Sequence, residues 1–164
     1  MTAAVTVLGF DVGARRIGVA VGNSVSMSAS EVGVLDVLEA GPDWPRLERW
    51  LREWRPDALV VGDPIPLEGG TQPARKRARR FARELIARYG LDVQQVDERA
   101  SSIEAAQRFA AGRRAGTRKR HQAANLDALA AVVIVERWLA EPQSRRRPGD
   151  PDPIASPTEP PAHE

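Results

Sequence analysis

Two short segments that alternate apolar and polar residues open the chain and predict a β-hairpin. Residues 5–12 and 16–22 each follow a period of two, with successive side chains on opposite faces of a sheet. Gly13 lies between them, where a backbone without Cβ bends at little cost. Residues 31–38 alternate enough to predict a third strand that pairs with this hairpin.

The rest of the pattern alternates helices with strands. Asp43 can cap a helix whose apolar residues recur at three- and four-residue spacing. Residues 58–62 are wholly apolar, which predicts a central strand covered on both faces, and 91–96 predict the last strand. Further helices are predicted at 71–89, 101–111 and 121–140. We therefore expect an α/β fold with a five-stranded mixed sheet, its first three strands antiparallel, its last two parallel, and helices on both faces.

The length and composition predict one folded domain and a tail. The chain has 164 residues, of which 42% are hydrophobic, enough for one core. The segment from residue 141 onward holds seven of the thirteen prolines and almost no apolar residues. We expect a folded domain at 1–140 and a disordered, proline-rich tail at 141–164.

Several classes of function are excluded by what the sequence lacks. It has no cysteine, which removes disulfides, thiolate catalysis and cysteine-based zinc sites. It has no apolar run of about eighteen residues and no basic, then apolar, leader at its start. These features favour a cytoplasmic protein without a membrane partner.

Positive charge is concentrated in places, although the net charge is only +2. Arginine supplies 22 of the 24 basic residues, and its planar guanidinium suits phosphate contacts. Six basic residues crowd nine positions of the helix predicted at 71–89: Arg75, Lys76, Arg77, Arg79, Arg80 and Arg83. They predict either a solvated basic face or contacts to a nucleic-acid backbone. A second basic stretch, residues 112–120, is interrupted by glycines.

Three carboxylates stand at unusual positions. Asp11 lies near the end of an apolar strand, where it is either a metal ligand or general base, or a turn residue that caps the hairpin. Glu98 follows the last predicted strand. Asp127 lies on the apolar stripe of the last helix, where an unpaired carboxylate would cost several kcal/mol.

The predicted topology brings these three acids together. In such a sheet the ends of the first and fourth strands are neighbours, and a helix packed behind them can direct a carboxylate between them. Three hard oxygen ligands suit Mg²⁺ or Mn²⁺. Divalent ions held by acids, with basic residues nearby, are the equipment for phosphodiester hydrolysis.

Four motifs in order resemble the YqgF family of pre-16S rRNA nucleases, also described as Holliday-junction-resolvase-like. They are Leu8 to Gly13 with Arg16 to Val21, Val60 to Gly62 with Pro64 and Gly69, Asp97 to Arg99 with Ser101 to Ala105, and Asp127 with Ala130 and Ala131. The resemblance covers about 5–139. Departures from the family pattern are Asn23, Asp63 and Ala100.

The resemblance implies an RNase H-like fold and metal-dependent nuclease chemistry that matures the 5′ end of small-subunit ribosomal RNA. It assigns Asp11, Glu98 and Asp127 as catalytic residues and metal ligands. Arg16 and Arg99 match basic positions of the family. The full predicted substrate-binding set is Arg15, Arg16, Arg99, Ser101, Arg118, Lys119 and Arg120.

The resulting prediction is a metal-dependent endonuclease that uses Mg²⁺ or Mn²⁺ on precursor rRNA within a pre-ribosome, as a monomer or weak homodimer. Two alternatives stay open: a Holliday junction resolvase acting on branched DNA as a symmetric dimer, and a non-catalytic RNA-binding ribosome-assembly factor. Asp11 followed by Gly13 also resembles the phosphate-binding hairpin of actin-like ATPases, but 164 residues are too few for their two domains.

Overall fold

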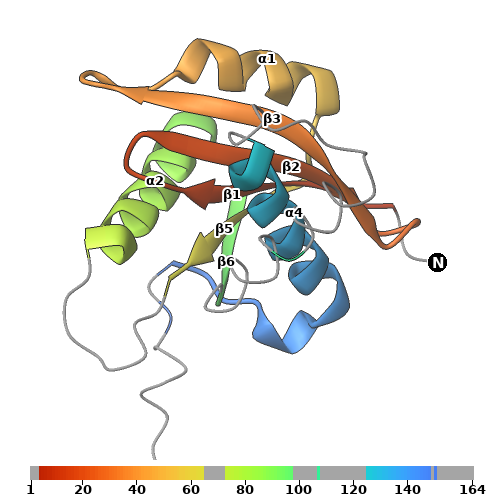
Figure 1. The fold of residues 1–164 in the computed structure, drawn as a ribbon. Coiled ribbons are helices and arrows are strands. Elements are labelled where there is room, and N and C mark those ends of the chain that lie inside the picture. The colour runs from red at the N-terminus through yellow and green to blue at the C-terminus, as the bar shows by residue number, and fades with distance from the viewer. Residues whose placement is uncertain (1–3, 65–72, 98–106, 108–124, 149, 151–164) are drawn as a thin grey trace, which may run out of the picture.

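The fold is a single mixed sheet between two layers of helix (Figure 1). The computed structural model describes residues 4–64, 73–97, 107, 125–148 and 150. Its strands in sequence order are β1 (Thr6–Val12), β2 (Arg16–Asn23), β3 (Ser28–Leu38), β4 (Gly41–Pro42), β5 (Ala58–Asp63) and β6 (Asp92–Asp97). Its helices are α1 (Trp44–Trp54), α2 (Pro73–Tyr89), α4 (Asn125–Ala140) and the short 3₁₀ helix η1 (Pro142–Ser144).

The strand order across the sheet is β4-β3-β2-β1-β5-β6. The first three strands are antiparallel neighbours, and β5 and β6 continue the sheet in parallel from β1, as the pattern predicts. The prediction of five strands is wrong by one short strand. Gly41 and Pro42, residue types that are common in turns, pair with Leu38 and Val37 at the edge of the sheet. Proline is tolerated there because an edge strand has one side without ladder hydrogen bonds.

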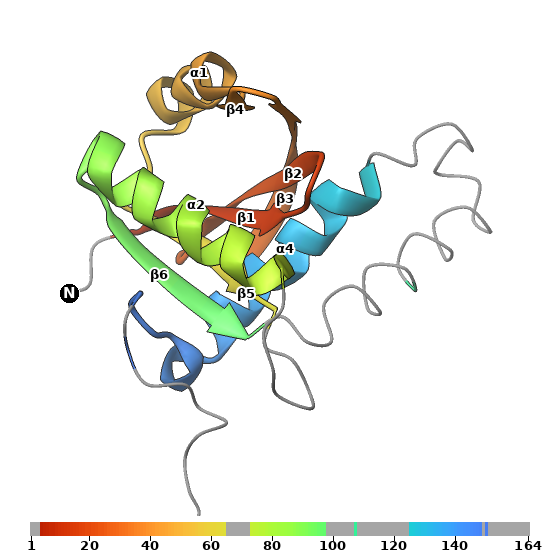
Figure 2. The same ribbon diagram turned by 90° about the vertical axis from the view of Figure 1, so that its left-hand side faces the viewer.

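The two faces of the sheet carry different helices (Figure 2). On one face, α1 and α2 cover a core that includes Leu8, Phe10 and Leu59. On the other face, α4 packs against β1, β2 and β3 and buries residues such as Val7 and Ala20. Because adjacent residues of a strand point to opposite faces, the alternation in β1 supplies both cores.

Helix α1 begins where the sequence predicts. The Asp43 carboxylate accepts a hydrogen bond from the backbone N–H of Arg46 at 3.2 Å and caps the helix. Its first tryptophan packs inward: the ring of Trp44 stacks on Phe81 of α2 with centroids 5.7 Å apart. Trp44 is therefore part of the contact between the two helices, as expected for core or rim tryptophans.

The chain stays in contact with the sheet beyond residue 140. Arg146 forms an antiparallel bridge with Gln95 of β6, through two backbone hydrogen bonds of 2.6 and 2.9 Å. Arg145 stacks on the ring of Trp138 at 3.7 Å and donates to its carbonyl. The predicted boundary between a folded domain at 1–140 and a tail at 141–164 stays a prediction. The residues just after this boundary lie along the outer edge of β6.

Some predicted segments lie outside the described residues. These are most of the helix expected at 101–111, the basic stretch at 112–120 and the tail from 151. None of the helices that the structure describes is both long and apolar enough to cross a membrane.

Candidate active site

The end of the β1–β2 hairpin positions the first candidate acid. Asp11 is half-buried near the end of β1 and pairs with Gly18 of β2. Residues paired across antiparallel strands point to the same face of the sheet. The face to which Gly18 points is the one covered by α4, because a Cβ built on Gly18 would lie 1.9 Å from the carbonyl oxygen of Asp127. Asp11 therefore points to the α4 face, beside the start of that helix.

Gly18 also explains how Asp127 reaches the sheet. All three atoms nearest to a Cβ at Gly18 are backbone atoms of Asp127 and Ala128, the closest at 1.9 Å. Only a residue without a side chain lets the helix backbone approach this closely. Asp11 and Asp127, which are 116 positions apart in the sequence, thus share Gly18 as a common neighbour.

The Asp127 carboxylate forms an ion pair with an arginine side chain. Its Oδ2 accepts a hydrogen bond from Nε of Arg16 at 2.8 Å. The two side chains are 31% and 51% exposed, and an ion pair this accessible contributes about 0–1 kcal/mol. Such a weak pair can exchange for another cation. Arg15, next to it in the turn, is exposed, and its carbonyl accepts the backbone N–H of Val37 at 2.9 Å.

The third predicted acid, Glu98, lies outside the described residues, one position after the end of β6. The same holds for five of the predicted substrate-binding residues: Arg99, Ser101, Arg118, Lys119 and Arg120. Within the described ranges, no three histidine or acidic side chains converge as a metal-binding group. The structure thus places two of the three predicted ligands, Asp11 and Asp127, next to Gly18, with Arg16 paired to the Asp127 carboxylate.

The donors that are brought together fit a hard divalent cation. Asp11 pairs with Gly18, the backbone of Asp127 lies against the same glycine, and the ion pair with Arg16 shows that the Asp127 carboxylate accommodates positive charge. Carboxylate oxygens are the ligands that Mg²⁺ and Mn²⁺ prefer. Two protein carboxylates are also the usual number for a Mg²⁺ site completed by waters and substrate phosphate.

Asp63, one of the departures from the family pattern, is buried and does not face solvent. Its side chain is 0% exposed at the end of β5. Arg75 of α2 donates to it at 2.9 and 3.2 Å, and Arg146 donates at 2.8 Å. The signal was available, because a carboxylate ending an apolar strand needs a partner. Its partners lie 12 and 83 positions away, which no local pattern indicates.

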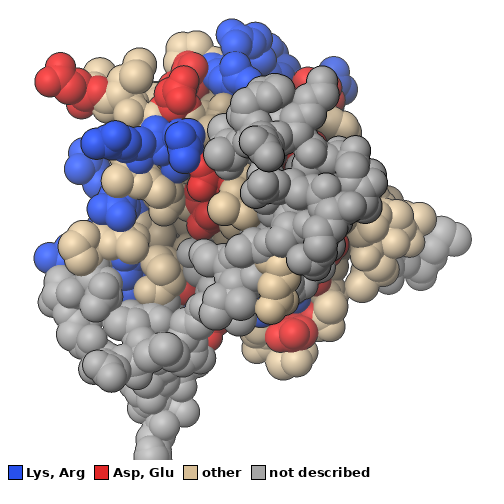
Figure 3. All heavy atoms as spheres, in the orientation of Figure 1, with Lys and Arg blue, Asp and Glu red and all other residues tan. Residues whose placement is uncertain are grey.

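The exposed part of α2 is basic. Figure 3 shows Lys and Arg gathered over this helix. Arg75 turns inward to Asp63, with 13% of its side chain exposed, so it does not belong to that face. Arg80 lies 3.8 Å from Glu84, and the exposed residues Lys76, Arg77 and Arg83 continue the basic surface.

The family model for RuvX, described as Holliday junction resolvase, matches residues 5–141, which include the whole described sheet and α4. The chain belongs to the RuvX family. Among curated RuvX relatives, the protein of Xanthomonas oryzae pv. oryzae strain PXO99A is 61% identical over 137 residues, covering 84% of this chain and 88% of that protein. The protein of Xanthomonas campestris pv. campestris strain 8004 is 59% identical over 138 residues, covering 84% and 89%. Both are named "Putative pre-16S rRNA nuclease".

A solved structure shares the RuvX fold at low identity. RuvC of Thermus thermophilus, solved in complex with a Holliday junction substrate, aligns with a TM-score of 0.50 at 18% identity. The alignment covers 87% of this chain and 99% of that chain. At this identity the likeness concerns the fold alone, and it agrees with the mixed sheet and its two helical layers.

Proposed function

We propose that the chain is a divalent-metal-dependent endonuclease that hydrolyses phosphodiester bonds of RNA, and that it processes the 5′ end of precursor 16S rRNA. The observation that carries the proposal is that Asp11 and the backbone of Asp127 both adjoin Gly18. Membership of a nuclease family supports the chemistry, and the names of its Xanthomonas relatives support the substrate. A cysteine-free chain suits the reducing cytoplasm, where we place the protein.

The residues of the site have distinct tasks in this proposal. Asp11 and Asp127 would hold Mg²⁺ or Mn²⁺, and Glu98 completes the ligand set that the family resemblance implies. A bound divalent ion activates water and stabilises the leaving oxygen. Arg16, half-exposed beside Asp127, presents a guanidinium where the scissile phosphate would approach. The exposed basic residues of α2 offer sequence-independent contacts to the RNA backbone.

Cleavage assays with matched variants test the proposal. The full chain, with millimolar Mg²⁺ or Mn²⁺, is incubated with a precursor 16S rRNA fragment. We expect Asp11→Asn and Asp127→Asn each to lower the rate by more than about 100-fold, since losing even a hydrogen-bond partner of a metal ligand costs about 10–100-fold. Glu53→Gln, an exposed acid on α1, is the control and should cut at the normal rate. Unchanged cleavage by Asp11→Asn would refute the assigned site.

A cellular measurement tests the processing role separately. Depletion of the protein should lead to accumulation of 16S rRNA with an unprocessed 5′ end, and wild-type protein should restore maturation where Asp11→Asn does not. Normal 5′ ends after depletion would contradict the rRNA role while leaving the nuclease chemistry intact.

A Holliday junction resolvase is the second candidate. The description of the RuvX family and the fold shared with RuvC favour it. Because a resolvase cuts a branched junction symmetrically as a dimer, sedimentation and side-by-side cleavage of a four-way DNA junction and precursor rRNA separate the two. A strict monomer that cuts only RNA excludes the resolvase. If the protein binds RNA but does not bind divalent ions and does not cleave RNA or DNA, it is a non-catalytic assembly factor instead.

A further inference from the structure

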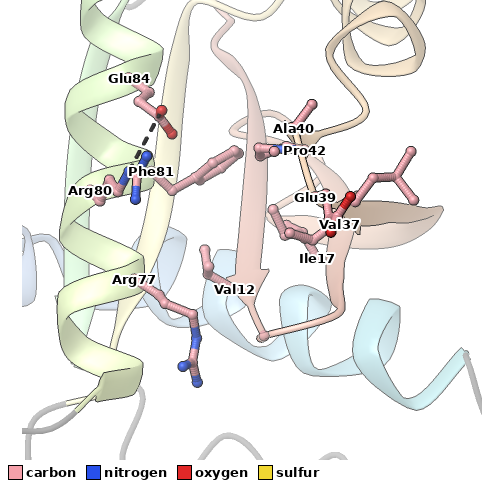
Figure 4. A pocket seen from close by; sticks show the side chains of 13 residues that line it. Val12, Ile17, Val37, Glu39, Ala40, Pro42, Arg77, Arg80, Phe81 and Glu84 are labelled. Atoms are coloured by element: carbon pink, nitrogen blue, oxygen red, sulfur yellow. Dashed lines mark ion pairs between the residues drawn. The ribbon is translucent and has the colours of Figure 1, made fainter.

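A cavity of about 260 Å³ lies at the end of the β1–β2 hairpin, on the face of the sheet opposite α4. Val12 and Ile17 pair across the hairpin and line it, one position beyond the pair formed by Asp11 and Gly18. Neighbouring pairs point to opposite faces, so the cavity and the candidate acids lie on the two sides of the same hairpin end. Figure 4 shows its walls, which are α2 on one side and the turn between β3 and β4 on the other.

The cavity has apolar residues both inside it and at its mouth. Phe81 of α2 lines it with a ring that is 2% exposed, already in contact with Phe10 and Trp44. Leu38 lines it from the end of β3 and is 65% exposed. An isolated exposed leucine needs no explanation. At the mouth of a cavity, however, it adds apolar surface that a flat, partly apolar ligand would cover.

The charges around the cavity are divided between its walls. Arg77 and Arg80 lie on the α2 wall, and Glu84 compensates Arg80 from 3.8 Å. In the described part of the chain, no carboxylate pairs with Arg77, which is exposed. Glu39 lies on the wall opposite Arg77 (Figure 4). An anionic group is therefore favoured at the Arg77 side, and a group that donates hydrogen bonds is favoured at the Glu39 side.

We propose that this cavity is a subsite for one unpaired nucleotide of the RNA substrate, with its base on Leu38 and its phosphate at Arg77. The inference rests on the proposed function, because it deepens the identity of that substrate. A volume of 260 Å³ is below the roughly 300–1,000 Å³ of pockets for drug-sized ligands, which limits the occupant to about one base. Apolar surface beside the exposed Arg77 guanidinium matches a base attached to a phosphate.

The proposal makes the substrate single-stranded near the cut. A base inside a duplex is stacked and paired, and it must be extruded before it can enter a pocket. Sequence-specific RNA recognition commonly uses unstacked bases in loops and single strands in this way. A strand that passes over the hairpin end would present one nucleotide to the cavity and a neighbouring phosphodiester to the Asp11 side.

Nucleotide titration of the isotope-labelled full chain tests the subsite without requiring cleavage. Adenosine monophosphate is compared with ribose 5-phosphate, which lacks the base. We expect adenosine monophosphate to shift the backbone amide signals of Gly13, Ala40 and Gly41 in the cavity wall, and ribose 5-phosphate to bind at least fivefold more weakly. Equal binding of both would show phosphate binding alone and overturn the proposal. Shifts that follow protein concentration instead would assign the cavity to a second copy of the chain, which also overturns it.

Matched variants extend the test to RNA. In the Asp11→Asn background, which keeps the RNA intact, affinity for a single-stranded oligonucleotide is measured by fluorescence anisotropy. Leu38→Asp should weaken binding at least fivefold, whereas Val25→Asp, the same change at a 76% exposed apolar residue in the β2–β3 turn, should leave it within twofold. Arg77→Ala is compared with Arg52→Ala of α1 in the same way. Equal effects within each pair would overturn the subsite.

The two proposals fail separately. A wild-type protein that cuts no RNA but binds adenosine monophosphate in the cavity refutes the nuclease function and leaves a nucleotide subsite. A protein that cuts RNA, with Leu38→Asp and Val25→Asp alike in affinity, keeps the nuclease function and refutes the subsite.

Discussion

At the residue scale, two carboxylates at the ends of apolar strands have opposite surroundings. Asp63 ends β5 and is fully buried between Arg75 and Arg146. Asp11 is near the end of β1 and half-buried beside Asp127, at the exposed end of the hairpin. A buried charge must be compensated within the fold, whereas an accessible acid can receive an external cation. Asp63 is therefore compensated inside the fold, and Asp11 is the more accessible of the two carboxylates.

The titration of Tyr89 can be followed without overlap from other phenols, because it is the one tyrosine of the chain. Burial, followed by the hydrogen bond that its hydroxyl donates to Glu48 at 3.1 Å, raises the pKa of Tyr89 to about 12. Absorbance titration of the phenol in the folded protein should therefore have its midpoint near 12, not at the ordinary value of about 10. Because the folded-state pKa lies above the unfolded one, folding favours the protonated phenol. This contribution to stability is complete below pH 10 and is lost as the pH rises towards 12.

Two variants separate the causes of this pKa shift. Glu48→Gln should lower the midpoint, but it should stay above 10, because burial is the larger cause. Glu39→Gln, whose carboxylate is not among the causes, should change nothing. Circular dichroism at each pH verifies that the protein is folded during the titration. A native midpoint at 10 would mean that the hydroxyl is solvated.

At the element scale, α4 connects the core to the site. Its residues are buried on nearly all sides, from Ala128 through Val135 and again at Trp138 and Leu139. The apolar stripe of this helix indicated in the sequence that it packs on the sheet. The sequence did not indicate that the glycines of β1 and β2 are the complement of this helix, because their alignment depends on strand register.

Substitution of Gly18 tests this contact. An alanine there would place its Cβ 1.9 Å from the Asp127 carbonyl oxygen, which belongs to the helix backbone and cannot rotate away. We expect Gly18→Ala to destabilise the fold by about 1–3 kcal/mol or more and to lower nuclease activity further, because Asp127 moves with the helix. Urea unfolding measures the first effect and RNA cleavage under native conditions the second.

Gly22→Ala is the matched comparison. Its Cβ would meet Cγ1 of Val135 at 2.3 Å, which is a side-chain atom. In a Val135→Ala background this clash disappears, so Gly22→Ala should then cost little stability, while Gly18→Ala should stay costly. Activity should survive in the Gly22 variant. Equal loss of activity at both glycines would show that Asp127 is not positioned through Gly18.

At the scale of the whole molecule, the sequence predicted the helices and strands better than the long-range contacts between them. Periodicity located each of the long strands and the helices at α1, α2 and α4, because each buries a regular apolar face. It missed β4, since Gly41 and Pro42 are typical of turns and their pairing depends on β3. From topology it predicted that Asp11 and Asp127 share one site, which stays a prediction. No local pattern could pair Asp63 with Arg146, because their contact exists only in the assembled sheet.

Divalent ions should stabilise the assembled molecule if the proposed site binds them. A ligand that binds only the folded state raises the melting temperature by mass action. A free ion concentration of about ten times its Kd adds about 1.4 kcal/mol to the free energy of unfolding, which corresponds to roughly 3–6 °C for a chain of this size. Differential scanning calorimetry with EDTA, Mg²⁺ or Mn²⁺ measures the shift. Asp11→Asn should abolish it and Glu53→Gln should preserve it. An equal rise in the Asp11 variant would assign the binding to another place.

The segment after α4 should contribute to global stability through Arg146. This residue bridges to Gln95 by backbone hydrogen bonds and neutralises the buried Asp63 together with Arg75. Truncation after residue 141 removes one of the two guanidiniums, and breaking a buried pair costs about 3–5 kcal/mol. We expect the melting temperature to fall by roughly 6–12 °C for a loss near the lower value. Arg146→Met in the full chain should reproduce most of this loss.

Truncation after residue 150 is the control, because it keeps every contact that the structure describes for Arg145, Arg146 and Arg147. Its melting temperature should equal that of the full chain. Asp63→Leu combined with Arg146→Met should be less destabilised than the sum of the two single variants, since replacing both charges avoids leaving one of them buried alone. If the two truncated proteins have the same melting temperature, the contacts of Arg146 do not contribute to stability, and the folded domain ends at residue 140.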